Sequence, residues 1–214
     1  MEKLDGNLTI DSFIDKLGSK EAVPGGGGAA ALTASLGISL CKMAANLTVG
    51  KKKYADVEEE MFKIIEECDR LARTFVSLIQ KDAEGFFPLS QAYGLPADTE
   101  EQRLYKEKVL ERELFTAAQV PFEIMENCAR AVELSLTVAQ KGSRLVVSDA
   151  ACAVKTLFSA MQCASLNVYI NTKYMKNREQ AVLLNKKADD LLESSRLLSE
   201  KVFDEVTASL KGQA

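Results

Sequence analysis

The sequence contains no histidine in its 214 residues. Histidine is the side chain best suited to acid–base chemistry near neutral pH, and it is a common ligand of zinc. Its absence removes both roles. If the chain is an enzyme, proton transfer must depend on Asp, Glu, Lys, Tyr, Cys or the substrate itself.

Proline is also scarce, with four in the chain and three of them before position 100. Long stretches are therefore free of strong helix breakers. Hydrophobic residues make up 47% of the chain and charged residues 27%, as in ordinary globular proteins. With no strand pattern, no linker and no repeat, we expect one all-α domain over residues 1–214, a single helical bundle.

The cysteines form no CxxC pair, and their number is odd. This argues for reduced thiols in a cytoplasmic protein rather than for a disulfide framework. The five are Cys41, Cys68, Cys128, Cys152 and Cys163.

Positive charge is in deficit, with a net charge of −4 and a pI near 5.2. This argues against nucleic acid as a partner. Four acidic residues within the first fifteen argue against a secretory signal. They are Glu2, Asp5, Asp11 and Asp15.

One uncharged run of 20 residues lies between Glu21 and Lys42, which is the length of a membrane span. It opens with Pro24 and four glycines, however, and it contains several hydroxyl residues. Its second part opens a helix predicted over Ala29–Leu47, which consists mostly of small residues and has no charged face until Lys42. We expect this helix to lie at the centre of a soluble bundle, with other helices around it and no membrane involved.

Helical periodicity predicts the remaining elements. Thr99 and Gln102 form the pattern of a capping box, and Gly142 suits a C-terminal cap. Ser148 or Asp149 is expected to cap the helix that follows. Gly85, Pro88 and Gly94-Leu95-Pro96 predict a kink and a loop, and Pro121 a kink or restart. The predicted helices span residues 8–18, 55–86, 99–140, 150–173 and 177–211.

Asp82 lies on the apolar face of the helix predicted over residues 55–86. The apolar stripe of that helix runs through Phe75, Leu78 and Ile79, and its next member is Asp82. A buried carboxylate is either paired or shifted in pKa and available for proton transfer. Asp82 is therefore a candidate general acid/base, with an internal ion pair or an error of register as the alternatives.

The glycine run Gly25, Gly26, Gly27 and Gly28 leads directly into a helix. Glycines allow a ligand to approach the backbone, and free N–H groups at a helix start favour an anion or a carbonyl oxygen. The run lacks the GK[ST] of a phosphate-binding loop and the strand of a dinucleotide fold. It is either a ligand site or a tight turn.

A basic segment follows the small-residue helix, with Lys51, Lys52 and Lys53 between Asn46 and Tyr54. Cations at the end of a helix interact favourably with its dipole. The same three lysines could instead bind a polyanionic tail. Considered alone, Asp149 is expected to be a helix cap, and Asn167 is expected to be an amide in the interior of a helix.

Together these segments resemble the cyclodeaminase domain of formiminotransferase-cyclodeaminase and the related stand-alone methenyltetrahydrofolate cyclohydrolases. The resemblance covers nearly the whole chain, in the family's order and spacing. The motifs on which the resemblance rests are Pro24–Gly28, Asn46–Tyr54, Asp82-Ala83 with Phe86, Leu95-Pro96, Ser148-Asp149-Ala150 and Asn167–Asn171.

This resemblance implies an all-α bundle, a homodimer or larger assembly, and a tetrahydrofolate substrate with no metal or redox cofactor. It also implies that Asp82 is the active-site proton acceptor. The chain departs from the family pattern at Gly142-Ser143-Arg144, where an Asn is common, and at Leu95-Pro96-Ala97, where a Lys is common. Pro88 is unusual as well.

Two reactions fit the resemblance, and the same side chains serve both. One is the cyclodeamination of 5-formimidoyltetrahydrofolate with loss of ammonia, and the other is the hydrolysis of the 5,10-methenyl ring. In either reaction Asp82 would move the proton. The glycine loop and Asn46 would orient the substrate, Lys51–Lys53 would hold a mono- or polyglutamate tail, and Tyr54, Ser148, Asp149 and Asn167 would complete the site. The competing hypothesis is a non-catalytic helical oligomerisation or folate-binding module.

Overall fold

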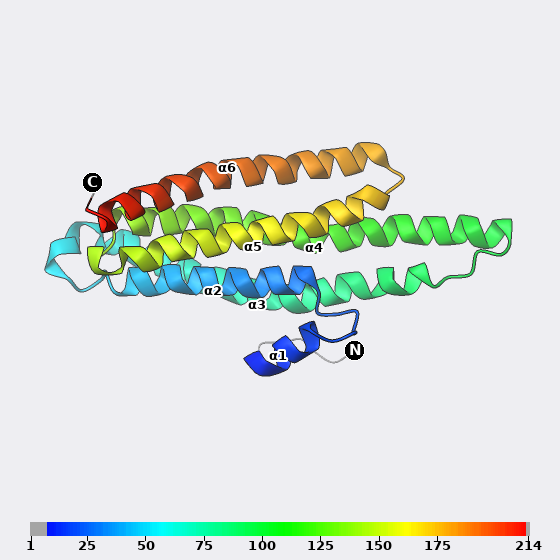
Figure 1. The fold of residues 1–214 in the computed structure, drawn as a ribbon, viewed down its shortest axis with the longest axis horizontal. Helices are drawn as coiled ribbons and strands as arrows, with labels where there is room; N and C mark the ends of the chain where they lie inside the picture. Colours follow the sequence, from blue (N-terminus) through cyan, green and yellow to red (C-terminus); the bar gives the residue numbers. More distant parts are fainter. Residues whose placement is uncertain (1–7, 213–214) are drawn as a thin grey trace.

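The computed structural model describes residues 8–212, and every regular element in this range is helical (Figure 1). Each long helix runs antiparallel to the one before it, as Figure 1 shows. The elements are α1 (Ile10–Leu17), α2 (Gly26–Asn46), the 3₁₀ turn η1 (Lys52–Val57), α3 (Glu58–Tyr93), α4 (Glu100–Lys141), the 3₁₀ turn η2 (Arg144–Val146), α5 (Val147–Tyr174) and α6 (Arg178–Leu210).

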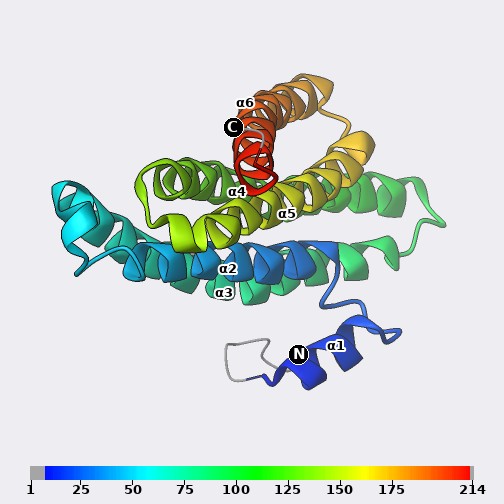
Figure 2. The same cartoon turned by 60° about the vertical axis from the view of Figure 1, so that its left-hand side comes forward.

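Four helices form two layers, with α2 and α5 in one and α3 and α4 in the other, and α6 packs on α4 and α5 (Figure 2). The layers differ in length. The helices α3 and α4 have 36 and 42 residues, against 21 in α2. They therefore extend past the first residue of α2, so that the start of α2 lies against the middle of both.

Small residues allow α2 to pack closely against its neighbours α3, α4 and α5. A methyl group at Gly37 would lie 2.7 Å from Cγ of Leu157 on α5, so this crossing requires glycine. Among the described residues, α2 is the one helix long and apolar enough to cross a membrane, and 56% of that apolar stretch is buried in the bundle. The prediction that other helices surround this one holds on the sides that face α3, α4 and α5, and its remaining face is exposed.

The two internal prolines do not end their helices. The helix predicted over residues 55–86 ends too early, because α3 continues through Gly85 and Pro88 to Tyr93, and the predicted loop begins at Gly94. Pro121 likewise lies within the continuous helix α4. A proline in a helix removes one N–H donor. At Pro88 the side chain is exposed, so water can reach the backbone there, and packing along the rest of each helix maintains the helical path.

The helix ends follow the sequence in part. The capping box of Thr99 and Gln102 is present at the start of α4, and Gly142 is its C-cap. The prediction that Ser148 or Asp149 caps α5 is wrong. The turn η2 carries the chain directly into α5, so that both residues lie inside its first turn and the N-cap is Val146.

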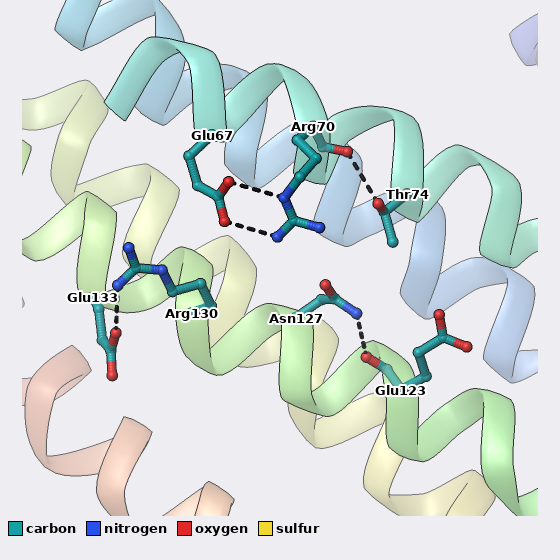
Figure 3. Close-up of polar contacts among 7 residues, drawn as sticks. All are labelled: Glu67, Arg70, Thr74, Glu123, Asn127, Arg130 and Glu133. Carbon is teal, nitrogen blue, oxygen red and sulfur yellow. Dashed lines mark hydrogen bonds and ion pairs between the residues drawn. The ribbon is translucent and has the colours of Figure 1, made fainter. Parts of the chain in front are cut away.

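The outer face of α3 and α4 is highly charged (Figure 3). Glu67 accepts two hydrogen bonds from Arg70, at 2.8 and 2.7 Å, and Arg130 donates to Glu133 at 2.9 Å. The guanidinium of Arg70 and, to a smaller extent, that of Arg130 lower the pKa of Glu67. This face is therefore well suited to contact with water.

Candidate active site

A cavity of about 310 Å³ lies at the N-terminus of α2. It forms where α2 begins and the longer helices α3 and α4 continue. The glycine loop lies on one side of it, Asp82 and Phe86 of α3 on another, and Asn167 and Asn171 of α5 on a third. The structure thus brings the glycine loop, Asp82 and Asn167 together, as the sequence predicted.

Asp82 lies directly against the first turn of α2. A methyl group built on Gly27 would be 2.1 Å from Oδ1 of Asp82, so the helix backbone and the carboxylate are in contact. The backbone N–H of Gly28 donates a hydrogen bond to the same carboxylate. The prediction that Asp82 lies on the inward-facing side of its helix is confirmed by these contacts.

Burial raises the pKa of Asp82 to about 6, and the hydrogen bond from Gly28 lowers it by a smaller amount. Within residues 8–212, no lysine or arginine is paired with this carboxylate. The structure therefore disfavours an internal ion pair. A carboxyl group with a pKa near 6 can both accept and return a proton close to neutral pH.

Two asparagines of α5 line the same cavity as Asp82. The amide nitrogen of Asn167 donates to the carbonyl of Cys163 at 2.9 Å, and that of Asn171 donates to the carbonyl of Asn167 at 2.8 Å. Because a carbonyl can only accept, each Nδ2 faces its own helix and each Oδ1 faces away. Asn171 is 7% exposed and lines the cavity.

Asn171 and Pro121 line the cavity but were not among the site residues that the sequence predicted. Asn171 carried a signal, since it lies one helical turn after Asn167 on the same face. Pro121 cannot donate to the carbonyl of Ala117, and both residues line the cavity. A proline inside α4 thus leaves the carbonyl of Ala117 without its usual helical donor at the wall of the cavity.

The aromatic residues Phe86 and Tyr93 of α3 also line the cavity. Tyr93 is 51% exposed, and Ile170 of α5 is exposed to the same extent. Flat apolar side chains at the rim of a polar cavity are suited to an aromatic ligand with polar edges.

The basic segment lies at the opposite end of α2. Asn46 is the exposed last residue of this helix, and Lys51 follows it. A helix of 21 residues is about 30 Å long, so Asn46 and the three lysines are about that far from the glycine loop. Figure 1 shows η1 at the far left end, away from the start of α2. Within one chain, these residues are not brought to Asp82.

Hydrogen bonds hold the basic segment against the chain between α4 and α5. The buried Oγ1 of Thr48 accepts from the backbone N–H of Ser143 at 2.9 Å, and Nζ of Lys51 donates to Oγ of Ser143 at 3.0 Å. The hydroxyl of Tyr54 accepts from the N–H of Arg144 at 3.1 Å. Lys52 and Lys53 remain exposed. Part of this motif therefore serves the fold, and two cations are left available.

Ser148 and Asp149 begin α5 at that same end, with Ser148 exposed and Asp149 half-buried. The predicted site residues thus fall into two groups, one around Asp82 and the other around Lys51. Among residues 8–212, no group of three Asp, Glu or Cys side chains is placed to hold a metal ion.

Comparisons with known proteins identify the family. A family model described as formiminotransferase-cyclodeaminase matches residues 9–190. A methenyltetrahydrofolate cyclohydrolase of Methylorubrum extorquens is 37% identical over 205 residues, covering 96% of this chain and 99% of that protein. A formimidoyltransferase-cyclodeaminase of Rattus norvegicus is 30% identical over 169 residues, which are 79% of this chain but 31% of the rat protein.

The fold is also known from a crystal structure. Formiminotetrahydrofolate cyclodeaminase of Thermotoga maritima superimposes with a TM-score of 0.79 over 94% of this chain and 98% of that chain, at 24% identity. The predicted all-α bundle is therefore confirmed by the structure and by a solved neighbour. From the extent of the family match and the identity to the Methylorubrum protein, this chain belongs to the formiminotransferase-cyclodeaminase family.

Proposed function

We propose that the chain is a cytoplasmic enzyme that hydrolyses 5,10-methenyltetrahydrofolate to 10-formyltetrahydrofolate. The observation that supports this most directly is the carboxyl group of Asp82, which lines a cavity, contacts the start of α2 and has a pKa raised to about 6. Hydrolysis is favoured because the cyclohydrolase of Methylorubrum extorquens matches this chain over almost its full length.

In this reaction Asp82 removes a proton from water as the water oxygen bonds to the methenyl carbon. The cationic ring becomes a neutral tetrahedral carbinolamine. Asp82 then returns its proton to N5 while the bond between that carbon and N5 breaks. The hydroxyl proton goes to solvent and leaves the formyl group on N10. General acid–base catalysis of this kind contributes roughly 10²–10⁴-fold.

The second candidate activity is the cyclodeamination of 5-formimidoyltetrahydrofolate, supported by the match to the rat formimidoyltransferase-cyclodeaminase. Here N10 attacks the carbon of the protonated formimidoyl group, whose nitrogen becomes an amino group, and N10 gives its own proton to Asp82. The amino nitrogen takes this proton as its bond to carbon breaks, and ammonia leaves. The same carboxyl group performs the same exchange in both reactions.

The substrate's head group would occupy the cavity. The glycine loop would contact it through the backbone, Asn167 and Asn171 would accept hydrogen bonds from its N–H groups, and Phe86 would pack against its ring. The anionic glutamate tail would lie against Lys51, Lys52 and Lys53. Tyr54, Ser148 and Asp149 lie at the same end as these lysines, near the tail. In this proposal residues 1–214 act as one domain of a homodimer, with no metal, redox cofactor, nucleic acid or membrane partner.

The proposal is tested by measuring the turnover of both substrates through the methenyl absorbance band. Three proteins are compared: the wild type, Asp82→Asn and Asp204→Asn. Asp204 is an exposed aspartate of α6, and its variant is the matched control. We expect the wild type and Asp204→Asn to consume the methenyl compound, and Asp82→Asn to lose at least about 100-fold in kcat.

A wild type inert on both substrates would overturn the enzymatic proposal. Thermal unfolding with and without folinic acid then distinguishes between the remaining hypotheses. Stabilisation would indicate a folate-binding module, and no shift would leave a module without folate affinity.

A further inference from the structure

The two prolines inside long helices lie in opposite surroundings. Pro88 of α3 is exposed, and so is Glu84, whose carbonyl would accept from the N–H that Pro88 lacks. Pro121 of α4 is buried, and Ala117, four residues before it, is 5% exposed. Both Ala117 and Pro121 line the cavity around Asp82. The same missing hydrogen bond is therefore turned toward solvent in α3 and toward the cavity in α4.

The carbonyl of Ala117 lies between these two residues at the cavity wall. In an α-helix each carbonyl points toward the N–H four residues later. Here that position is Pro121, which has no N–H and whose ring pushes the carbonyl aside. The neighbouring side chains of Thr116 and Gln119 bond to carbonyls one turn earlier in α4 instead. A buried acceptor without a donor costs free energy, so this carbonyl is suited to a donor supplied by a ligand.

The register of α3 against α4 places this carbonyl beyond Asp82 along the bundle. A methyl group on Gly85 would lie 3.7 Å from Cγ2 of Val120. Because α3 and α4 run antiparallel, Ala117, three residues before Val120, is level with a point three residues after Gly85. Gly85 is itself three residues after Asp82, so the separation along the bundle is about 9 Å. The carbonyl therefore lies toward one end of the cavity, and Asp82 toward the other.

A second acceptor lies near the same level on α5. The carboxylate of Glu111 in α4 accepts a hydrogen bond from the backbone N–H of Lys176, just past the end of α5. Because these helices are also antiparallel, six residues forward from Glu111 and six back from Lys176 set Ala117 level with Ile170, the neighbour of Asn171. Asn171 is buried and lines the cavity, and its amide oxygen faces away from its own helix. Two acceptors thus lie at about the same depth on facing helices.

Two acceptors at one end of a cavity match an amino group, which carries two N–H bonds. In the proposed substrate, the 2-amino group of the pterin is at the opposite end of the two fused rings from the reacting carbon. With Asp82 at that carbon, the fused rings and a hydrogen bond at their far end span a separation of the order seen here. The amino group would then lie between the carbonyl of Ala117 and the amide of Asn171.

We propose that the carbonyl of Ala117 and Oδ1 of Asn171 accept the two N–H bonds of the pterin 2-amino group, and that Pro121 is the positioning residue that leaves this carbonyl available. The inference rests on the proposed function, because it assigns one end of that substrate. A residue with an N–H at position 121 would satisfy the carbonyl from within α4 and so remove the acceptor from the site. The helix therefore forgoes one of its own hydrogen bonds in favour of the substrate.

Pro121→Ala tests this role, with Pro88→Ala as the matched control. Each replacement restores an N–H inside a long helix, but only one of the two carbonyls lines the cavity. We expect the Kd of folinic acid, measured by titration calorimetry, to rise about tenfold in Pro121→Ala and to stay unchanged in Pro88→Ala. KM for the methenyl substrate should rise by the same factor with a smaller change in kcat, because the contact is remote from the reacting carbon. Circular dichroism confirms that both variants are folded.

A second ligand separates the lost acceptor from a change in the shape of the wall. This ligand is the analogue of folinic acid in which a methyl group replaces the 2-amino group, so that it cannot donate. We expect the wild type to bind the analogue on the order of 100-fold more weakly than folinic acid, because both acceptors lose their donor. Pro121→Ala has already lost one acceptor, so its ratio should fall to about tenfold, while Pro88→Ala keeps the wild-type ratio.

A wild type that binds folinic acid and the analogue equally well would overturn the inference without the use of any variant. Equal ratios in the wild type and Pro121→Ala would overturn it too, and in both cases turnover of the methenyl compound would leave the proposed function standing. If the predicted ratios are found but neither folate is converted, the proposed function fails and the contact with the 2-amino group is retained. A wild type that neither binds folinic acid nor converts a folate would overturn both.

Discussion

The carboxylate of Asp82 occupies the space in which a side chain at Gly27 would lie. A methyl group there would approach Oδ1 to 2.1 Å and Cγ to 2.5 Å, far inside van der Waals contact. The glycine run therefore has a specific role at one position, which is to let the first turn of α2 touch the acid. The ligand-site interpretation of this run gains support from that contact.

Replacement of Gly27 by alanine is expected to lower kcat by about 100-fold, because the added methyl group displaces the carboxylate. Gly85→Ala is the matched control, since a methyl group at Gly85 meets only Cγ2 of Val120, at an ordinary 3.7 Å, and Gly85 is not among the residues that line the cavity. Steady-state kinetics on the methenyl substrate, with circular dichroism of both variants, makes the comparison. Equal activity in the two variants would show that the position of Asp82 is unimportant.

The raised pKa of Asp82 predicts a pH dependence of activity. A proton acceptor must be ionised, so kcat/KM is expected to be constant above about pH 7 and to fall tenfold per pH unit well below pH 6. Initial rates in buffers of equal ionic strength would show this. An inflection near pH 4, the ordinary value for an aspartate, would contradict the proposed environment of Asp82.

The same pKa makes a prediction about stability. The carboxyl group binds its proton more tightly when folded, so its contribution is favourable below pH 3.8 and is lost as the pH rises through about 6. At pH 8 the ionised group costs up to about 3 kcal/mol. We therefore expect Asp82→Asn to be more stable than the wild type at pH 8, with an advantage that shrinks toward pH 4. Urea unfolding of both proteins at several pH values, with Asp204→Asn as a control, measures the difference.

The features that the sequence predicted well are those set by local periodicity. Asp82 continues the stripe of Phe75, Leu78 and Ile79, and the structure places it against α2. The capping box of Thr99 and Gln102 needs only its own turn of helix, and it is present. Such features depend on residues three or four apart, so no tertiary information is needed to find them.

The features that the sequence predicted poorly depend on tertiary contacts. Pro88 and Pro121 carry a strong breaker signal, but packing along α3 and α4 overrides it. The distance between Lys51 and Asp82 follows from the length and direction of α2, which motif order along the chain does not reveal. The place of Asn171 in the cavity depends on the path of α5 past the glycine loop, which the sequence does not show.

Asn171 is predicted to orient the substrate through its amide oxygen. Asn171→Ala removes that acceptor, and we expect KM to rise about tenfold with a smaller change in kcat. Asn127→Ala is the matched control, because Asn127 makes the same hydrogen bond to the carbonyl four residues earlier, at 2.7 Å, on the charged face of α3 and α4 (Figure 3). A change in both variants alike would indicate a structural role in the helix, and no change in Asn171→Ala would exclude the contact with substrate.

Thr48 is predicted to anchor the basic segment to the chain between α4 and α5. Its buried hydroxyl donates to the carbonyl of Ala44 at 2.8 Å and accepts from the N–H of Ser143 at 2.9 Å. Thr48→Val leaves that buried N–H without a partner, which costs roughly 1–3 kcal/mol. Thr116→Val is the control, since the exposed Thr116 bonds only to the carbonyl of Arg112. Thermal unfolding should therefore show a clear loss for Thr48→Val and almost none for Thr116→Val. If both variants unfold at the wild-type temperature, the hydroxyl of Thr48 is dispensable. The basic segment is then held in place by the hydrogen bonds of Lys51 and Tyr54 alone.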